Sequence, residues 1–119
     1  MNEYKLGIVE GKFADIIWEN EPLSSSELAK IALKELEWKK STTYTVLKRL
    51  CDRGIFINES GVVSSLISKK DFYALQSEKF VEETFSGSLP AFVAAFSSRK
   101  KLSEDEINQL QSMIDSMRR

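Results

Sequence analysis

The sequence predicts a mainly α-helical chain with a small β-hairpin, and three observations lead to this fold class. Apolar residues recur at helical spacing along most of the 119 residues. Residues 55–67 instead hold two β-branched and aromatic runs, separated by residues that favour turns. With 42% hydrophobic and 29% charged residues the composition is that of a folded protein, and the length fits one domain or one small domain with an appendage.

The region before residue 38 is predicted to form two amphipathic helices. The first runs from about Lys5 to Glu19 and is ended by the Asn-Glu-Pro sequence at residues 20–22. The second begins after Ser24, because Glu27 three residues later completes the pattern of a capping box. The apolar stripes are Val9, Phe13, Ile16 and Ile17 in the first helix and Leu28, Ile31, Ala32 and Leu36 in the second.

Residues 38–54 are predicted to form a third helix, which carries the concentrated positive charge of the chain. This segment holds five cations and one anion, whereas residues 1–37 have a net charge of −4 and residues 55–119 of −1. At about 100° per residue, one face of this helix is apolar or small and the opposite face is polar. The inner face consists of Thr43, Val46, Leu47, Leu50 and Gly54, and the outer face of Ser41, Thr45 and Lys48, flanked by Tyr44 and Arg49.

An outer face of hydroxyls, a phenol ring and cations is what a helix needs to enter the major groove of DNA. The alternative is an ordinary solvated helix face. The residues expected near base edges or phosphates are Ser41, Thr42, Tyr44 and Thr45. Those expected mainly at phosphates are Lys39, Lys40, Lys48 and Arg49.

A hairpin is predicted directly after Gly54, a residue whose freedom at positive φ suits the C-terminal cap of the third helix. Its strands lie within residues 55–57 and 62–67, and the turn is Asn58-Glu59-Ser60-Gly61. Three helices followed by a two-stranded hairpin is the winged helix-turn-helix arrangement, in which the third helix reads the groove. We therefore expect residues 1–67 to form a winged-helix DNA-binding domain.

Residues 68–119 are predicted to form three more helices, with more apolar surface than they can cover themselves. Ser68 with Asp71, and Ser103 with Glu106, have the spacing of N-terminal caps. Residues 89–96 are apolar on every side, and the polar residues 97–101 after them read as a connection.

We therefore expect these helices to form the dimerisation region of an interlocked homodimer. The alternative is that Phe92 and Phe96 fold back on the N-terminal core of the same chain. The expected dimer contacts are Phe80, Phe85, Leu89, Phe92, Val93, Phe96, Ile107, Leu110 and Ile114.

The sequence lacks the residues that most enzymes and metal-binding proteins use. The chain has no His and a single cysteine, Cys51, so the usual general base and a thiolate metal site are both missing. We expect no enzyme activity, metal or cofactor. Cys51 is either a packing residue or, less in keeping with its place on the inner side of a helix, a redox switch. No run of apolar residues suits a membrane span or a signal peptide, so we expect a cytoplasmic protein.

Several sequence features, in this order, resemble one family of repressors. They are Trp18 with Pro22-Leu23 after it, Trp38, Thr42, Thr45, Leu47, Arg49, Leu50 and Gly54, then Phe85-x-Gly87-Ser88-Leu89, Val93-Ala94-Ala95-Phe96 and Leu102-Ser103-x-x-Glu106. On these residues the chain resembles the penicillinase repressor family, which includes methicillin-resistance and copper-transport regulators. The resemblance covers nearly the whole chain.

This resemblance implies a homodimer that binds a palindromic operator in double-stranded DNA and represses transcription. It also implies a partner protease, linked to a sensor, that cuts an Asn-Phe bond in the dimerisation region. The matching bond here is Ala95-Phe96, so the residue before the bond differs. Copper sensing through a C-terminal cysteine motif is excluded, because the tail has no cysteine.

Two departures from the family pattern affect the expected DNA contacts. The hairpin has neither Lys nor Arg, so its contacts with phosphates are expected to be weak. Lys39 stands at the usual cap of the third helix, which leaves Ser41 or Thr42 as possible caps. The absence of cations from the hairpin and a pI of about 5.6 favour a rival hypothesis, a dimeric interaction module without DNA binding. Since no polar cluster in an apolar setting is evident, release from DNA is expected to need no small ligand.

Overall fold

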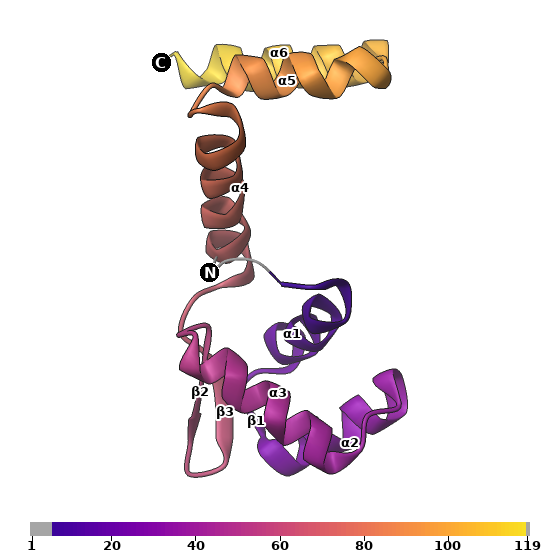
Figure 1. Ribbon diagram of the computed structural model, residues 1–119, viewed down its shortest axis with the longest axis vertical. Helices are drawn as coiled ribbons and strands as arrows, with labels where there is room; N and C mark the ends of the chain where they lie inside the picture. The colour runs from indigo at the N-terminus through magenta and orange to yellow at the C-terminus, as the bar shows by residue number, and fades with distance from the viewer. Residues whose placement is uncertain (1–5, 119) are drawn as a thin grey trace. The chain divides into compact units, whose positions relative to one another are not determined.

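The computed structural model describes residues 6–118 and confirms the mainly α-helical fold class with a small sheet (Figure 1). The described elements are, in order, α1 (Ile8–Asn20), β1 (Leu23–Ser24), α2 (Ser25–Leu36), α3 (Lys40–Asp52), β2 (Phe56–Glu59), β3 (Val62–Ser65), α4 (Lys69–Phe85), α5 (Leu89–Arg99) and α6 (Glu104–Met117). The chain divides into two compact units within α4, after Ser77. None of the described helices is both long and apolar enough to cross a lipid bilayer.

α1 begins later than the sequence predicted, and Lys5 lies outside the described residues. Gly7 is the N-cap, and its N–H donates to Oε1 of Glu10 at 3.2 Å, which fixes the first turn. The predicted apolar stripe was wrong at Val9, which is 49% exposed. Ala14 is buried in its place, together with the three predicted residues Phe13, Ile16 and Ile17.

α2 and α3 follow the sequence prediction closely on their inner faces. Ser24 caps α2 by accepting a hydrogen bond from the N–H of Glu27 at 3.0 Å, as expected. The cap prediction for α3 was wrong, because Lys39 is the N-cap without a side-chain hydrogen bond and both Ser41 and Thr42 lie inside the helix. Gly54 follows α3 with a φ of 81° and is exposed, so its predicted place on the inner face was wrong. The confirmed inner residues of α3 are Thr43, Val46, Leu47 and Leu50.

The sheet has three antiparallel strands in the order β1-β3-β2, one more than the predicted hairpin. β1 is only two residues long and pairs Leu23 with Val63, which is too short for a sequence signal. The predicted four-residue turn was also too long. Ser60 and Gly61 alone form the turn, with φ values of 52° and 86°, as a two-residue hairpin turn requires.

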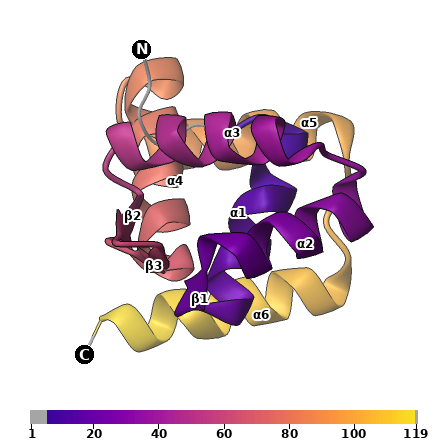
Figure 2. The ribbon, with the colours of Figure 1, turned by 90° about the horizontal axis from the view of Figure 1, so that it is seen from below.

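The hairpin is held against the helices by polar contacts and by its buried aromatic residue. Both the N–H and the hydroxyl of Ser65 donate to Oε1 of Glu21 at 2.8 Å, which ties the end of β3 to the segment after α1. Phe56 of β2 is fully buried, and its ring centroid lies 5.2 Å from that of Trp18. In Figure 2, α3 begins near the end of α2 and ends beside this hairpin, as it does in Figure 1.

The first turns of α4 belong to the same packed unit. Trp18 donates its indole N–H to the carbonyl of Ile67 at 3.1 Å, and its ring lies 5.7 Å from the buried ring of Phe72. The Nζ of Lys69 lies 3.0 Å from Oδ1 of Asp15 on α1. The predicted cap of α4 is confirmed, since the hydroxyl of Ser68 accepts from the N–H of Asp71 at 3.1 Å.

The second unit contains the rest of α4 with α5 and α6. The predicted polar connection at residues 97–101 was wrong in part, because α5 continues to Arg99. The hydroxyls of Ser97 and Ser98 donate to the carbonyls of Val93 and Ala95 at 2.8 Å, so they stay compatible with a helix. The capping box of α6 is confirmed: Ser103 and Glu106 exchange hydrogen bonds of 2.9 and 3.1 Å.

Candidate nucleic-acid interface

The outer face of α3 brings most of the predicted DNA-binding residues to one exposed surface. The exposed members are Lys39, Lys40, Ser41, Thr42, Thr45, Lys48 and Arg49, and Tyr44 is half-buried. The face can be this polar because α3 is anchored from the other side, where Leu47 and Leu50 are buried in the core. A helix held in this way presents its polar side chains on a rigid element.

Some cations on this face of α3 are paired with carboxylates, and others are not. Nζ of Lys48 lies 3.1 Å from a carboxylate oxygen of Asp52, one helical turn further on. Arg49 and Arg53 both approach Oε2 of Glu10 on α1, at 3.2 and 4.0 Å. The cations of the C-terminal half of α3 are therefore partly neutralised.

The cations at the N-terminal end of α3 are not neutralised in this way. Within residues 6–118, Lys39 and Lys40 make no ion pair, and Nζ of Lys40 lies 5.9 Å from the centre of the Tyr44 ring. The backbone N–H groups of the first helical turn add to the positive potential at this end. The uncompensated positive charge of α3 is thus concentrated beside Ser41 and Thr42.

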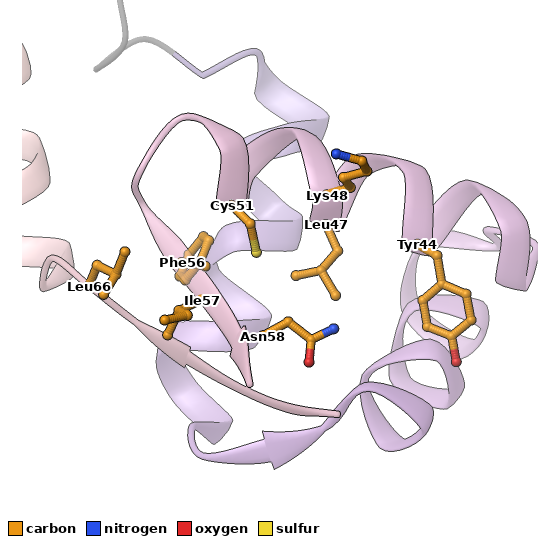
Figure 3. A pocket seen from close by; sticks show the side chains of 8 residues that line it. All are labelled: Tyr44, Leu47, Lys48, Cys51, Phe56, Ile57, Asn58 and Leu66. Atoms are coloured by element: carbon orange, nitrogen blue, oxygen red, sulfur yellow. The ribbon is translucent and has the colours of Figure 1, made fainter. Parts of the chain in front are cut away.

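An open groove of about 520 Å³ separates α3 from the hairpin (Figure 3). Its apolar floor is accompanied by a few polar groups, so the expectation that no polar cluster lies in an apolar setting was wrong here. The groove is lined by Tyr44, Leu47, Lys48, Cys51, Phe56, Ile57, Asn58 and Leu66. Tyr44 and Lys48, two of the predicted DNA-binding residues, therefore stand at a concave edge of the outer face.

Cys51 lies in this groove and is half-buried. Burial raises the pKa of its thiol above the ordinary value, and the nearby carboxylate of Asp52 raises it further, while Lys48 acts in the opposite direction. A thiol with a raised pKa is a poor nucleophile at neutral pH. This environment favours the packing role of Cys51 over the redox switch.

Sequence reasoning missed three residues of this surface. Asp52 was visible as an i, i+4 partner of Lys48, so the helical spacing could have revealed it. Asn58 was interpreted as part of the turn, but it lies in β2, lines the groove and accepts a hydrogen bond from the N–H of Gly61 at 3.0 Å. Glu10 gave no signal, because it lies 39 residues before its partner Arg49.

The second unit exposes most of the side chains expected at a dimer contact. No residue of α5 or α6 is buried, within the described chain. Phe85 and Phe92 are half-buried, with ring centroids 5.6 Å apart. The others are between 39% and 59% exposed: Phe80, Leu89, Val93, Phe96, Ile107, Leu110 and Ile114.

No metal-binding cluster is apparent in the described part of the chain, where no three His, Cys, Asp or Glu side chains are grouped to hold an ion. The Ala95-Phe96 bond lies in the middle of α5 and both residues are exposed. Cleavage at this bond would require α5 to unfold locally, since a protease binds its substrate in an extended form.

A family model and several known proteins match almost the whole chain. The sequence model of one family, described as penicillinase repressor, matches residues 6–116. Methicillin resistance regulatory protein MecI of Staphylococcus aureus (strain Mu50 / ATCC 700699) is 24% identical over 116 residues, covering 94% of both chains. The penicillinase repressor of Bacillus licheniformis is 26% identical over 104 residues, covering 84% of this chain and 81% of its own. With this match over its length, the chain belongs to the penicillinase repressor family, whose members are transcriptional regulators and not enzymes.

Proposed function

We propose that this protein is a homodimeric transcriptional repressor that binds a palindromic operator with the N-terminal end of α3. The observation that carries the proposal is the pairing pattern of the α3 cations. Lys39 and Lys40 lack a carboxylate partner within the described chain and stand beside exposed hydroxyls. In helix-turn-helix proteins the first residues of the third helix are those that contact base edges.

The predicted residues then divide by chemistry. Ser41, Thr42, Tyr44 and Thr45 offer hydroxyl groups for base edges or nearby phosphates. Lys39, Lys40, Lys48 and Arg49 contribute mainly to phosphate binding. The hairpin adds little charge, since β2 and β3 have no Lys or Arg.

We assign DNA binding to residues 1–67 and dimerisation to residues 68–119. Support for the second assignment is the apolar surface of α5 and α6, which a second copy of the chain would cover. Two copies related by a twofold axis would present two α3 helices, and a palindromic operator has the matching symmetry. A dimer also gains affinity because binding of one half-site brings the second within reach.

Release from the operator, in this proposal, follows proteolysis within the dimerisation region by a sensor-linked protease. The candidate bonds are Ala95-Phe96 in α5 and those of the predicted connection at residues 97–101, of which residues 100 and 101 follow α5. Isolated helices of this length are marginally stable in water, so α5 can open locally when its apolar side chains are uncovered. A cut here would separate α6 from the rest and remove part of the apolar dimer surface.

The test begins with selection of bound duplexes from a random DNA pool by the full chain. Binding to the selected duplex is then measured at several salt concentrations. Lys48→Ala should weaken binding to all sequences alike and lower the salt slope by about one unit per bound chain, whereas Tyr44→Phe or Thr45→Val should change the sequence preference. Lys101→Ala, in the connection before α6, is the charge-matched control and should leave both unchanged.

The rival function is a dimeric interaction module without DNA binding. It is favoured by the absence of cations from the hairpin and by the partial neutralisation of Lys48, Arg49 and Arg53. That function would be indicated if the selection enriches no sequence and the wild-type chain and the four variants bind DNA equally weakly.

A further inference from the structure

Glu10 of α1 makes contacts that the proposed DNA binding does not use. Oε1 of its carboxylate accepts from the N–H of Gly7 at 3.2 Å, and Oε2 lies 3.2 Å from an Nη1 of Arg49 and 4.0 Å from that of Arg53. Its side chain is only 24% exposed. One carboxylate therefore connects the start of α1 to two arginines at the C-terminal half of α3.

The contact with Glu10 leaves much of the Arg49 guanidinium exposed. Its side chain is 54% exposed and belongs to the outer face of α3, next to Thr45. A guanidinium carries five N–H donors in a rigid planar fork, and the contact with Glu10 uses one nitrogen of that fork. The remaining donors keep a fixed direction, so less side-chain entropy is lost when they bind an oxygen anion.

The accessible part of this cluster is a cation. Arg49 and Arg53 both approach Oε2 of Glu10, at 3.2 and 4.0 Å. The carboxylate is mostly covered, whereas the Arg49 fork is half exposed. An incoming phosphate would therefore meet the cation before the anion.

We propose that Glu10 is a positioning residue for DNA binding: it holds Arg49 so that the free side of the guanidinium faces a backbone phosphate. The inference rests on the proposed function and adds a residue outside α3 to the interface. It predicts that removal of a negative charge from the protein weakens its binding to a polyanion. A general field effect gives the opposite sign, because loss of an anion near DNA increases affinity.

Glu10→Gln is the variant that isolates this role. An amide keeps one acceptor oxygen, which can still accept from the N–H of Gly7 and preserve the cap of α1. The amide nitrogen is a hydrogen-bond donor, so it cannot form a hydrogen bond with the N–H donors of Arg49 that it faces. The substitution thus removes the contact with Arg49 while it leaves the local helix start intact.

The experiment is a double-mutant cycle on the selected duplex, with the wild-type chain, Glu10→Gln, Arg49→Ala and the double variant. We expect Glu10→Gln to weaken binding roughly three- to ten-fold in the wild-type background, as loss of a charge-assisted hydrogen bond does. We expect it to have no weakening effect in the Arg49→Ala background. The salt slope of Glu10→Gln should fall toward that of Arg49→Ala.

Asp15→Asn is the matched control, since Asp15 is also on α1 but pairs with Lys69 and not with α3. It should bind DNA as tightly as the wild-type chain or slightly more tightly. Equal weakening by Glu10→Gln in both backgrounds would overturn the inference, and so would tighter binding in the wild-type background. If the wild-type chain binds no duplex at all, the proposed function fails as well, and this result differs from both of the others.

Discussion

At the scale of single residues, the inner face of α3 contains one unusual polar group among its buried apolar side chains. Thr43 is fully buried in the inner face, and its hydroxyl oxygen has no hydrogen-bond partner among the described residues. Helical periodicity placed Thr43 inside correctly, because the period depends only on residue spacing. The contact of Glu10 with Arg49 could not be predicted, because it depends on how α1 packs against α3.

Thr43→Val should therefore stabilise the protein. A valine has nearly the shape of threonine and removes a buried hydroxyl that makes no compensating bond, so we expect the free energy of unfolding to rise by about 1 kcal/mol. Urea unfolding followed by tryptophan fluorescence measures this change. Thr45→Val, on the exposed face, is the control and should change stability by less than about 0.5 kcal/mol. A less stable Thr43→Val variant would show that the hydroxyl is hydrogen-bonded after all.

At the scale of elements, the sequence correctly predicted the starts of α2, α4 and α6 but not those of α1 and α3. Ser24, Ser68 and Ser103 all cap helices as their spacing to an acidic residue indicated. The failures lie where the pattern is ambiguous: Ser97 and Ser98 look like a linker, yet their hydroxyls bond within α5. β1 escaped prediction because two residues carry no period and are defined only by pairing with β3.

The capping box of α6 should make this helix sensitive to acid. Hydrogen bonds from the backbone N–H of Ser103, and then from its side chain, lower the pKa of Glu106. A carboxyl group with a lowered pKa stabilises the folded form above its unfolded pKa, and this contribution is lost as the pH falls through the folded pKa. Circular dichroism should show more loss of helix between about pH 7 and about pH 3 in the wild-type chain than in Glu106→Gln. Glu104→Gln, outside the capping box, should titrate like the wild-type chain, and equal curves for all three would contradict this account.

Cleavage of α5 is the second prediction at this scale. In cells in which the regulated gene has been switched on, a blot should show a fragment shorter than the full chain. Mass spectrometry should place its end at Ala95 or within residues 97–101, the two candidate sites. Full-length protein that has left its operator, with no fragment, would exclude the proteolytic route and direct attention to an effector.

At the scale of the whole molecule, the two units expose different kinds of surface. The first unit has one core of buried apolar side chains, which includes Phe13, Phe56 and Phe72, whereas no residue of α5 or α6 is buried. The sequence predicted the excess of apolar surface in residues 89–96, because no polar face interrupts it. It could not predict the groove between α3 and the hairpin, since that groove forms only when Tyr44 and Asn58 are brought to opposite walls (Figure 3).

Phe96→Asp should yield monomers that bind DNA poorly. A charge placed in an apolar contact without a partner costs several kcal/mol, and a monomer loses the linked binding of the second half-site. Sedimentation velocity of the variant measures the oligomeric state. Leu33→Asp, which changes an exposed apolar residue of α2, is the control and should remain dimeric. If Phe96→Asp also remains dimeric, the α5 surface is not the dimer contact.

The most direct test of the central claim, that the N-terminal end of α3 binds DNA, is the salt dependence of Kd for the selected duplex. The double variant Lys39→Ala/Lys40→Ala should lose about two units of salt slope per bound chain, because each lysine that neutralises a phosphate releases one counterion. Lys100→Ala/Lys101→Ala removes the same charge from the connection before α6 and should keep the wild-type slope. Equal slopes for the two double variants would contradict the assignment of the DNA contact to the start of α3.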